Sequence, residues 1–269
     1  MRRAAFSFAR QPEPAGRHPR TPVPAVLAIN PNTTAAVTAL VEAHLRATAP
    51  AIDWRMATGR FGARYITSEA SFAIASHASI DAWAEHGASC DAVLLACFGD
   101  PGLFALRELS PVPVVGLAEA SMQAAAETAR RFSIVTGGPR WAPMLERLAQ
   151  ELGFGVRLAS VRTIEITGAQ AAADPERTVA ALAQACKDAR AKDSADAVIL
   201  GGAGFAGFAA LVEPRVADAG VKVIDSVIAG AQAAGRLALG APWPYARRAG
   251  AKQTPATGLG AALADKLVE

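Results

Sequence analysis

The sequence predicts an α/β protein made of two similar halves, each built around a parallel sheet. Short apolar runs rich in β-branched residues alternate with alanine-rich amphipathic stretches, which is typical of βαβ units. Several of these runs also recur, in the same order, in the second half of the chain. We therefore expect two halves of one architecture, with a small-ligand site in the cleft between them.

The first half contains three pairs of a strand and a following helix. Each predicted strand is short and apolar, and each predicted helix is rich in alanine or leucine. The expected strands are 25–30, 91–97 and 112–116, and the helices that follow them are 33–48, 101–109 and 119–131.

The second half repeats the alternation. The expected strands are 132–136, 155–161, 196–201 and 221–225. The expected helices are 142–152, 175–192, a short one after residue 201, and a closing one at 226–239. Strands alternating with helices in this way form parallel sheets, in which ligands bind beyond the carboxyl ends of the strands.

An internal repeat links the two halves. The stretch DAVLLACFG at 91–99 aligns with DAVILGGAG at 196–204, and VLAIN, ending at Asn30, matches FSIVT, ending at Thr136. A third pair begins at Val112 and Val221. If the halves face each other, the paired loops after these strands line one cleft.

We expect the chain to divide into an arm, two subdomains and a tail. The first segment carries several arginines and prolines without a continuous apolar stretch, so it is predicted to be a disordered basic arm. The predicted boundaries are 1–22 for this arm, 23–116 plus 226–245 for the first subdomain, 117–225 for the second, and 246–269 for a tail that is helical at its end.

Charge and cysteine content exclude several classes of protein. The net charge is +3 and much of the excess lies in the arm, so neither nucleic acid nor a membrane is an expected partner. Three cysteines are too few for a disulfide framework and suit a reducing cytoplasm. The histidines lack metal-ligand partners at fitting spacing, so no metal is expected. We expect a homo-oligomer with a small-molecule substrate.

Cys97 is the most informative cysteine. It ends an apolar run and is followed by Phe98, Gly99, Asp100 and Pro101. Asp100 could cap the next helix with Pro101 as its first residue, which would place the thiol beside a helix N-terminus. Free N–H groups and the helix dipole there favour a thiolate. The alternative is that Cys97 is a small buried apolar residue at a strand end.

Six motifs occur in the order INPNTT, LLACFGDPGL, PVVGLAEAS, FSIVTGG, VILGGAGFAG and VIDSV. Together they resemble the landmarks of hydantoin and allantoin racemases in the aspartate/glutamate racemase superfamily, over about residues 24–239. The resemblance implies two α/β subdomains related by a pseudo-twofold axis, with a cofactor-independent active site between them. It implies proton transfer at a carbon next to a carbonyl.

The same resemblance implies roles for individual residues. In that family, two cysteines on opposite faces of the stereocentre accept and donate the proton, and Cys97 matches the first of them. The remaining expected site residues bind the substrate through loop backbone and side chains: Asn30, Phe98, Gly99, Thr136, Gly137, Gly202, Ala203 and Gly204.

The chain departs from the family pattern at the second cysteine, whose place is taken by Gly202. A glycine can neither give nor take a proton, and a lost acid–base group costs on the order of 10² to 10⁴-fold in rate. Three outcomes stay open. The chain racemises with water or another side chain at this position, it decarboxylates and protonates one face as arylmalonate decarboxylases do, or it has lost activity.

Two other functional hypotheses compete with the racemase hypothesis. Gly202, Gly204 and Gly207 spell the glycine pattern of a dinucleotide-binding loop after a strand, with Asp225 where a ribose-binding acid belongs. Only one strand follows, which is too little for a complete dinucleotide fold. Two lobes around a cleft also describe a non-catalytic binder of small ligands. Asp225 is expected to cap the helix after it, with an orienting role as the alternative.

Overall fold

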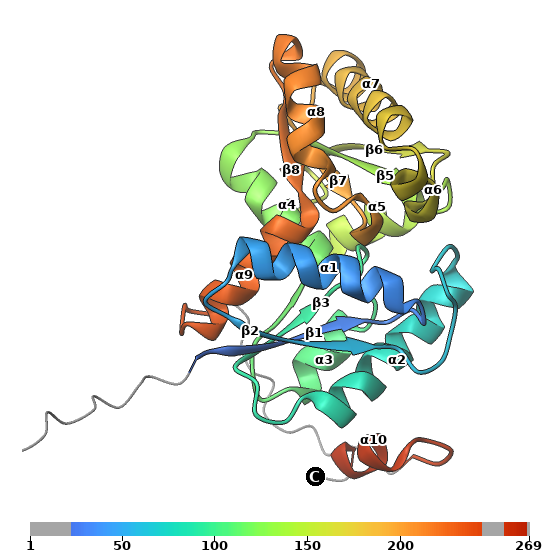
Figure 1. Cartoon of the computed structure of the whole chain (residues 1–269), viewed down its shortest axis with the longest axis vertical. Coiled ribbons are helices and arrows are strands. Elements are labelled where there is room, and N and C mark those ends of the chain that lie inside the picture. The colour runs from blue at the N-terminus through green and yellow to red at the C-terminus, as the bar shows by residue number, and fades with distance from the viewer. Residues whose placement is uncertain (1–22, 244–255, 268–269) are drawn as a thin grey trace, which may run out of the picture.

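The computed structural model describes residues 23–243 and 256–267, and the predicted arm lies outside this part of the chain. Two four-stranded parallel sheets form two stacked α/β domains, with helices on both faces of each sheet (Figure 1). The predicted fold class is confirmed. No described helix combines the length and apolar character that a membrane span requires.

The first sheet has the strand order β2-β1-β3-β4. Its strands are β1 (Ala25–Asn30), β2 (Asp53–Thr58), β3 (Ala92–Leu95) and β4 (Val114–Gly116). Its connecting helices are α1 (Ala35–Thr48), α2 (Glu69–His86) and α3 (Leu103–Leu109). The sequence did not predict β2 or α2, and it placed the start of α3 two residues too early.

The second sheet has the order β6-β5-β7-β8, which repeats the first. Its strands are β5 (Phe132–Gly137), β6 (Leu158–Ile164), β7 (Ala197–Gly201) and β8 (Lys222–Asp225). The helices are α4 (Leu117–Thr128), α5 (Trp141–Glu151), α6 (Gly168–Ala173), α7 (Pro175–Asp193), α8 (Phe208–Val216) and α9 (Ser226–Ala238). The strands that the repeat paired, such as β3 with β7, take equivalent places in the two sheets.

Alternate residues of the strands point to different cores. Val26 and Ala28 of β1 face a central core that also contains Phe132 and Ile199 of the second sheet. Leu27 and its neighbours on the opposite face pack under α2 and α3 in an outer core of the first domain. Because side chains alternate across a strand, one apolar run serves both faces of a buried parallel sheet. The central core therefore joins the two domains.

Helices α4 and α9 pack against each other at the centre of the molecule, between the two sheets. α9 also contacts α1 and β3 of the first domain, so the chain returns to the first sheet after completing the second. The close approach depends on Gly230, because a Cβ at this position would overlap the side chain of Leu117 at the start of α4. The helix pair forms the junction between the domains.

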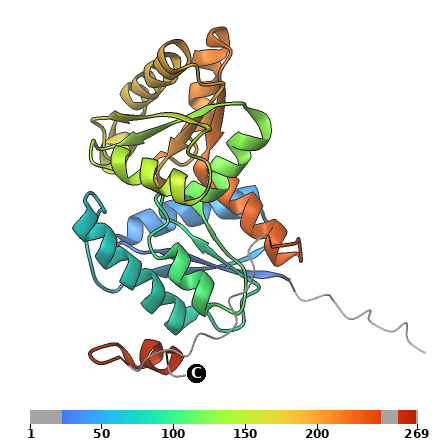
Figure 2. The same cartoon turned by 180° about the vertical axis from the view of Figure 1, so that it is seen from behind.

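The end of the described chain lies against the first domain. The short helix α10 (Ala261–Lys266) packs on α2, as seen from behind in Figure 2. Its Leu263 side chain is buried. A hollow of about 370 Å³ remains between this segment and the outer helices. It is lined by His77, Ile80, Ala105, Glu108, Leu109, Leu259, Leu263 and Leu267.

Replacing glycine by alanine is expected to have opposite effects on stability at two positions of α9. Gly230→Ala is expected to lower the free energy of unfolding by about 1–3 kcal/mol, because the new methyl group overpacks against Leu117. Gly235→Ala places its Cβ 3.6 Å from Cγ1 of Ile52, an ordinary contact, and is expected to raise it by about 0.5–1 kcal/mol. Denaturant unfolding measures both. Equal effects at the two positions would contradict the packing described.

Candidate active site

Loops after equivalent strands of the two sheets meet at the domain junction. The ring of Phe98, after β3, lies where a Cβ of Gly201 at the end of β7 would be. Gly99 is covered from the other side by Trp141 at the start of α5, since a Cβ there would lie 2.5 Å from Cζ3 of the indole. The structure thus brings the ends of β3 and β7 together, with the start of α5 against the β3 turn.

Cys97 is buried in a small apolar cluster at this junction. Ile66 and Ala75 of the first domain contact it, and two aromatic side chains complete the cover: Phe72 on α2 and Trp141 on α5. The two rings meet edge to face with centroids 6.4 Å apart. The thiol is therefore shielded by one aromatic ring from each domain.

The electrostatic surroundings of Cys97 are the opposite of those predicted. Burial, and then the negative charge of Asp100, raise the pKa of the thiol to about 12. A buried thiolate loses its hydration and meets a like charge, so the neutral form is favoured. The expectation of a helix N-terminus that stabilises the thiolate was wrong, because α3 begins at Leu103 rather than at Pro101.

Asp100 does not cap the helix that follows it. The N-cap of α3 is Gly102, and the buried carboxylate of Asp100 instead accepts hydrogen bonds from the N–H groups of Ala118 (2.9 Å) and Glu119 (2.8 Å) at the start of α4. A Cβ at Gly116 would overlap this carboxylate, so only glycine fits there. Asp100 thus joins the turn that carries Cys97 to the central helix pair.

Two oppositely charged side chains lie near the carboxylate of Asp100. Arg107 of α3 forms an ion pair with the buried Glu119 of α4 and donates to the carbonyl of Val114 at 3.1 Å. Burial raises the pKa of Asp100 to about 7, although the two N–H donors of α4 oppose the shift. Asp100 is therefore poised between its two protonation states near neutral pH.

Asn30 lies at the end of β1 with its side chain fully buried. Its amide nitrogen donates to Oδ1 of Asn32 at 3.1 Å and to Oγ1 of Thr38 at 3.0 Å. Its amide oxygen accepts from the backbone N–H of Asn32 at 3.3 Å. These side-chain bonds join the loop after β1 to α1, and the carbonyl of Asn30 accepts from the N–H of Gly59 at 2.8 Å. The side chain of Asn30 therefore has structural partners within the first domain.

The β5 end supplies the neighbouring wall. Thr136 is buried, and Gly137 lies close under the loop after β6, since a Cβ there would be 2.5 Å from the carbonyl oxygen of Ile166. Trp141 follows within the same connection and turns back over Gly99. The Thr136–Gly137 segment therefore adjoins the Cys97 turn through Trp141.

The loop after β7 differs from the loop after β3. Gly202 has a φ of 133°, which L residues rarely adopt, whereas Cys97 at the equivalent place has no positive φ. A Cβ built on Gly202 would point to the ring of Phe205, 3.4 Å from Cδ2. An apolar ring thus borders the position that a second acid–base side chain would need. A cysteine could enter only with backbone strain, typically about 1–3 kcal/mol.

The other glycines of this loop are explained by packing. Gly204 lies against Gly168 at the start of α6, where a Cβ would be 2.6 Å from the facing Cα. Gly207 lies against His44 of α1, and its N–H donates to Oδ2 of Asp225 at 2.8 Å. Oδ1 of Asp225 also accepts from two N–H groups at the start of α9, which confirms the predicted cap.

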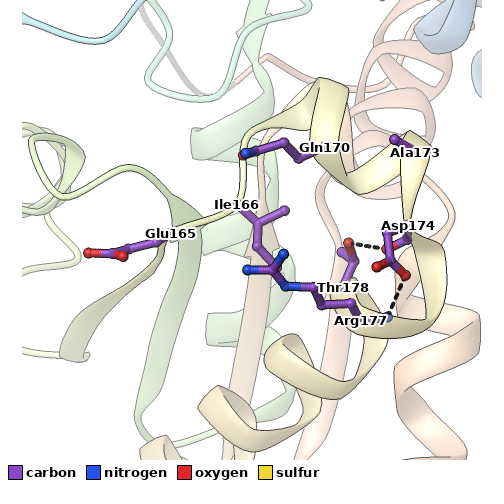
Figure 3. Close-up of a pocket in the computed structure, with 7 residues that line it drawn as sticks. All are labelled: Glu165, Ile166, Gln170, Ala173, Asp174, Arg177 and Thr178. Atoms are coloured by element: carbon purple, nitrogen blue, oxygen red, sulfur yellow. Dashed lines mark hydrogen bonds between the residues drawn. The ribbon is translucent and has the colours of Figure 1, made fainter.

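A hollow of about 220 Å³ lies near the outer edge of the second domain, beyond β6 (Figure 3). None of the predicted site residues lines it. Its walls come from the loop after β6 and from α6 and α7: Glu165, Ile166, Gln170, Ala173, Asp174, Arg177 and Thr178. Within the described part of the chain, no group of three or more histidine, cysteine or acidic side chains could hold a metal ion.

Comparison with known proteins agrees with this fold. Residues 26–234 match the Asp/Glu/Hydantoin racemase family. The chain belongs to this family.

Particular relatives are hydantoin and allantoin racemases. The chain is 44% identical over 140 residues to a hydantoin racemase of a Pseudomonas strain, a match covering 52% of this chain and 55% of that protein. It thus spans about half the length of that relative. A hydantoin racemase of Paenarthrobacter aurescens is 36% identical, covering 79% of this chain and 90% of the relative. The structure of an allantoin racemase from Pseudomonas fluorescens matches with a TM-score of 0.75 and 30% identity, over 79% of this chain and 90% of that one.

Several residues around Cys97 had no signal in the sequence. Trp141 and Phe72 come from helices far apart in the chain, and Phe205 was hidden inside a glycine-rich motif. The repeat offers one clue to Phe205, since it aligns with Asp100 in the other half. A comparison of the two copies position by position would have found this replacement of a carboxylate by a ring.

The aromatic cover predicts how Cys97 reacts. With a pKa of about 12, roughly one thiol in 10⁵ is ionised at pH 7, so alkylation of Cys97 by iodoacetamide is expected to be slow. Trp141→Ala opens the cluster and rehydrates the thiol, which should accelerate labelling at least about tenfold. Peptide mass spectrometry measures each cysteine separately.

Cys186 provides an internal control for this experiment. It is buried on α7, away from Trp141, and its pKa is also raised to about 12 by burial. Its labelling should not change. Faster labelling of both cysteines would mean that Trp141→Ala loosens the whole protein, and unchanged labelling of Cys97 would contradict the aromatic cover.

Proposed function

We propose that this protein is a cofactor-independent enzyme of the racemase/isomerase type that transfers a proton at the carbon next to a carbonyl of a hydantoin-like substrate. Cys97 is the catalytic acid–base group on one face of that carbon. The observation that carries the proposal is a buried thiol at a strand end, at the junction of two equivalent domains, in a chain of the hydantoin racemase family. Amino acids and small carboxylates are the other substrates considered.

The proposed step moves one proton and one electron pair. The thiolate of Cys97 takes the hydrogen of the substrate carbon, and the electron pair of the C–H bond moves into the adjacent carbonyl to give an enolate. In the reverse step, the neutral thiol returns the proton to carbon. Loop groups near the thiol are proposed to bind the substrate: Asn30, Phe98, Gly99, Thr136, Gly137, Gly202, Ala203 and Gly204.

The raised pKa of Cys97 favours the second of these steps. A thiol with a pKa of about 12 is a weak acid, but at pH 7 it is almost always protonated and so has a proton to return to the enolate, whereas the thiolate that acts as the base is scarce. On the opposite face, Gly202 supplies no proton and Phe205 lies beside it. These contacts support a site that is strongly asymmetric between the two faces of the substrate, with water as the exchange partner on the Gly202 side.

Apolar surroundings support a particular kind of substituent on the substrate. Phe72, Trp141 and Phe98 are gathered around the Cys97 turn. Such rings suit an alkyl or aryl group at the reacting carbon better than the ureido group of allantoin, since an unpaired polar group is costly in apolar surroundings. We therefore propose 5-alkyl and 5-aryl hydantoins as the preferred class.

A second candidate follows from the same asymmetry. An enzyme that decarboxylates a prochiral malonate needs only one proton donor, because loss of CO₂ generates the enolate without a base. A neutral thiol at Cys97, with glycine at the equivalent position 202 of the other half, fits this reaction, as a single-cysteine decarboxylase of the arylmalonate type. Its product would be one enantiomer of the monoacid, protonated on the Cys97 face.

The other two readings have less support. In the dinucleotide reading, Gly207 would offer its N–H to a pyrophosphate, but that N–H already donates to Asp225. A non-catalytic binder would not need the thiol. We further propose that the enzyme works without a metal or other cofactor in the reducing cytoplasm, where its three free cysteines are stable.

Proton exchange in heavy water tests the proposed function. The protein is incubated in D₂O with a 5-benzyl or 5-isobutyl hydantoin, and loss of the C5 proton is followed by NMR. We expect enzyme-dependent exchange that Cys97→Ser lowers by at least about 10²-fold, because a hydroxyl is a far weaker acid than a thiol. Cys90→Ser, with a buried thiol outside this cluster, serves as the matched control and should keep the activity.

Each outcome of this experiment has a meaning. Exchange that survives in Cys97→Ser rules out Cys97 as the catalytic group. Absence of exchange together with CO₂ release from an aryl malonate, again dependent on Cys97, would replace the racemase with the decarboxylase. If neither reaction occurs while the hydantoin binds to the protein, a non-catalytic binder is the correct assignment.

A further inference from the structure

Asp100 is the buried charged group nearest to the chemistry that the proposed mechanism does not use. Its side chain leaves the Cys97 turn and ends at the N-terminus of α4. Its backbone N–H donates to the carbonyl of Cys97 at 3.0 Å, which closes the turn. Asp100 adopts a positive φ of 55°, a conformation that aspartate tolerates better than most residues. Both its backbone and its side chain therefore fix the place of Cys97.

The second half of the molecule has a corresponding connection built in the opposite direction. There Asp225 belongs to the helix end and reaches back to the loop, accepting from Gly207 as well as from α9. Asp100 belongs to the loop and reaches to the helix end. In the repeat, Asp100 aligns with Phe205 and Asp225 aligns with Gly116. Each loop-to-helix connection therefore has one aspartate, on the loop in the first half and at the helix end in the second.

This reversal places a carboxylate on the turn itself in the first half only, because Asp225 reaches its loop from the helix end. Four ionisable groups are involved: Cys97 on the turn, Asp100 itself, Glu119 on α4 and Arg107 on α3. The ion pair between Arg107 and Glu119 pairs those two charges with each other. The charge of Asp100 is the one that acts directly on the thiol.

We propose that Asp100 is a positioning residue for Cys97, which holds the thiol-bearing turn on α4 and, through its charge, adds to the effect of burial in disfavouring ionisation of the thiol. This rests on the proposed function in so far as Cys97 is the acid–base group. Ionised Asp100 disfavours a second negative charge beside it. Its effect is present above its own pKa of about 7 and is lost as the pH falls through that value.

Titration of the thiol tests the proposal without turnover. In a protein carrying Cys90→Ser and Cys186→Ala, the thiolate of Cys97 is read at pH 10 as the difference in ultraviolet absorbance from the same protein carrying Cys97→Ser as well. The subtraction removes the absorbance of the two tyrosines, which also ionise near this pH. Asp100→Asn removes the charge and is expected to raise the thiolate fraction about tenfold, a fall of about one unit in the pKa of Cys97. Asp225→Asn removes the equivalent connection at α9 and should leave this fraction unchanged.

A merely structural role for Asp100 predicts a different result. Lost anchoring without an electrostatic effect would leave the thiolate fraction as it is in wild type, and this overturns the proposal. An equal rise in Asp225→Asn also overturns it, because the rise would then report general loosening. If Asp100→Asn does not fold, Asp100→Ser keeps an uncharged acceptor for one N–H of α4, and the same rise is expected.

The role proposed for Asp100 and the proposed function of the protein are contradicted by different results. Failure to exchange the C5 proton of any hydantoin contradicts the function, whatever the thiol titration shows. An unchanged titration contradicts the role of Asp100, even in an active enzyme.

Discussion

The packing of α4 against α9 is the constraint on which the rest of the site depends. Both turns of the junction are tied to the N-termini of this helix pair, one by Asp100 and the other by Asp225. Gly230 allows the two helices to approach closely. Because a packed helix pair resists deformation, the turns after β3 and β7 keep a fixed relation to each other. Two domains thus behave as one frame for a small substrate.

The two domains share one architecture, but the turns after β3 and β7 carry different side chains. One turn carries a thiol with a carboxylate behind it, and the other carries a glycine with a phenylalanine ring beside it. The same strand order and the same helix anchors thus carry an ionisable side chain at Cys97 and none at Gly202. The pKa of about 12 at Cys97 follows from burial under Phe72 and Trp141 together with the charge of Asp100. The burial of Cys97 and the protonation of its thiol therefore have one cause.

The sequence predicted the buried strands well because each is a continuous apolar run bounded by polar residues. It missed β2, whose DWRMAT carries charges typical of a partly exposed edge strand, and α2, whose alanines and serines leave no clear apolar stripe. It located Cys97 at a strand end but misjudged its pKa. That pKa depends on Trp141 and on the partners of Asp100 in α4, and neighbours brought in by tertiary packing leave no local pattern. The cap at Asp225 was predictable because its partners follow it directly in the chain.

The stereochemical course of exchange tests the one-sided site most directly. Each enantiomer of a 5-substituted hydantoin is incubated separately in D₂O, and deuterium uptake and inversion are followed on the same sample by mass spectrometry and chiral chromatography. A one-sided site would make one enantiomer exchange its C5 proton faster than it inverts, because Cys97 would remove and return hydrogen on its own face. Exchange that equals inversion from both enantiomers would contradict it, since a second acid–base group must then act on the Gly202 face.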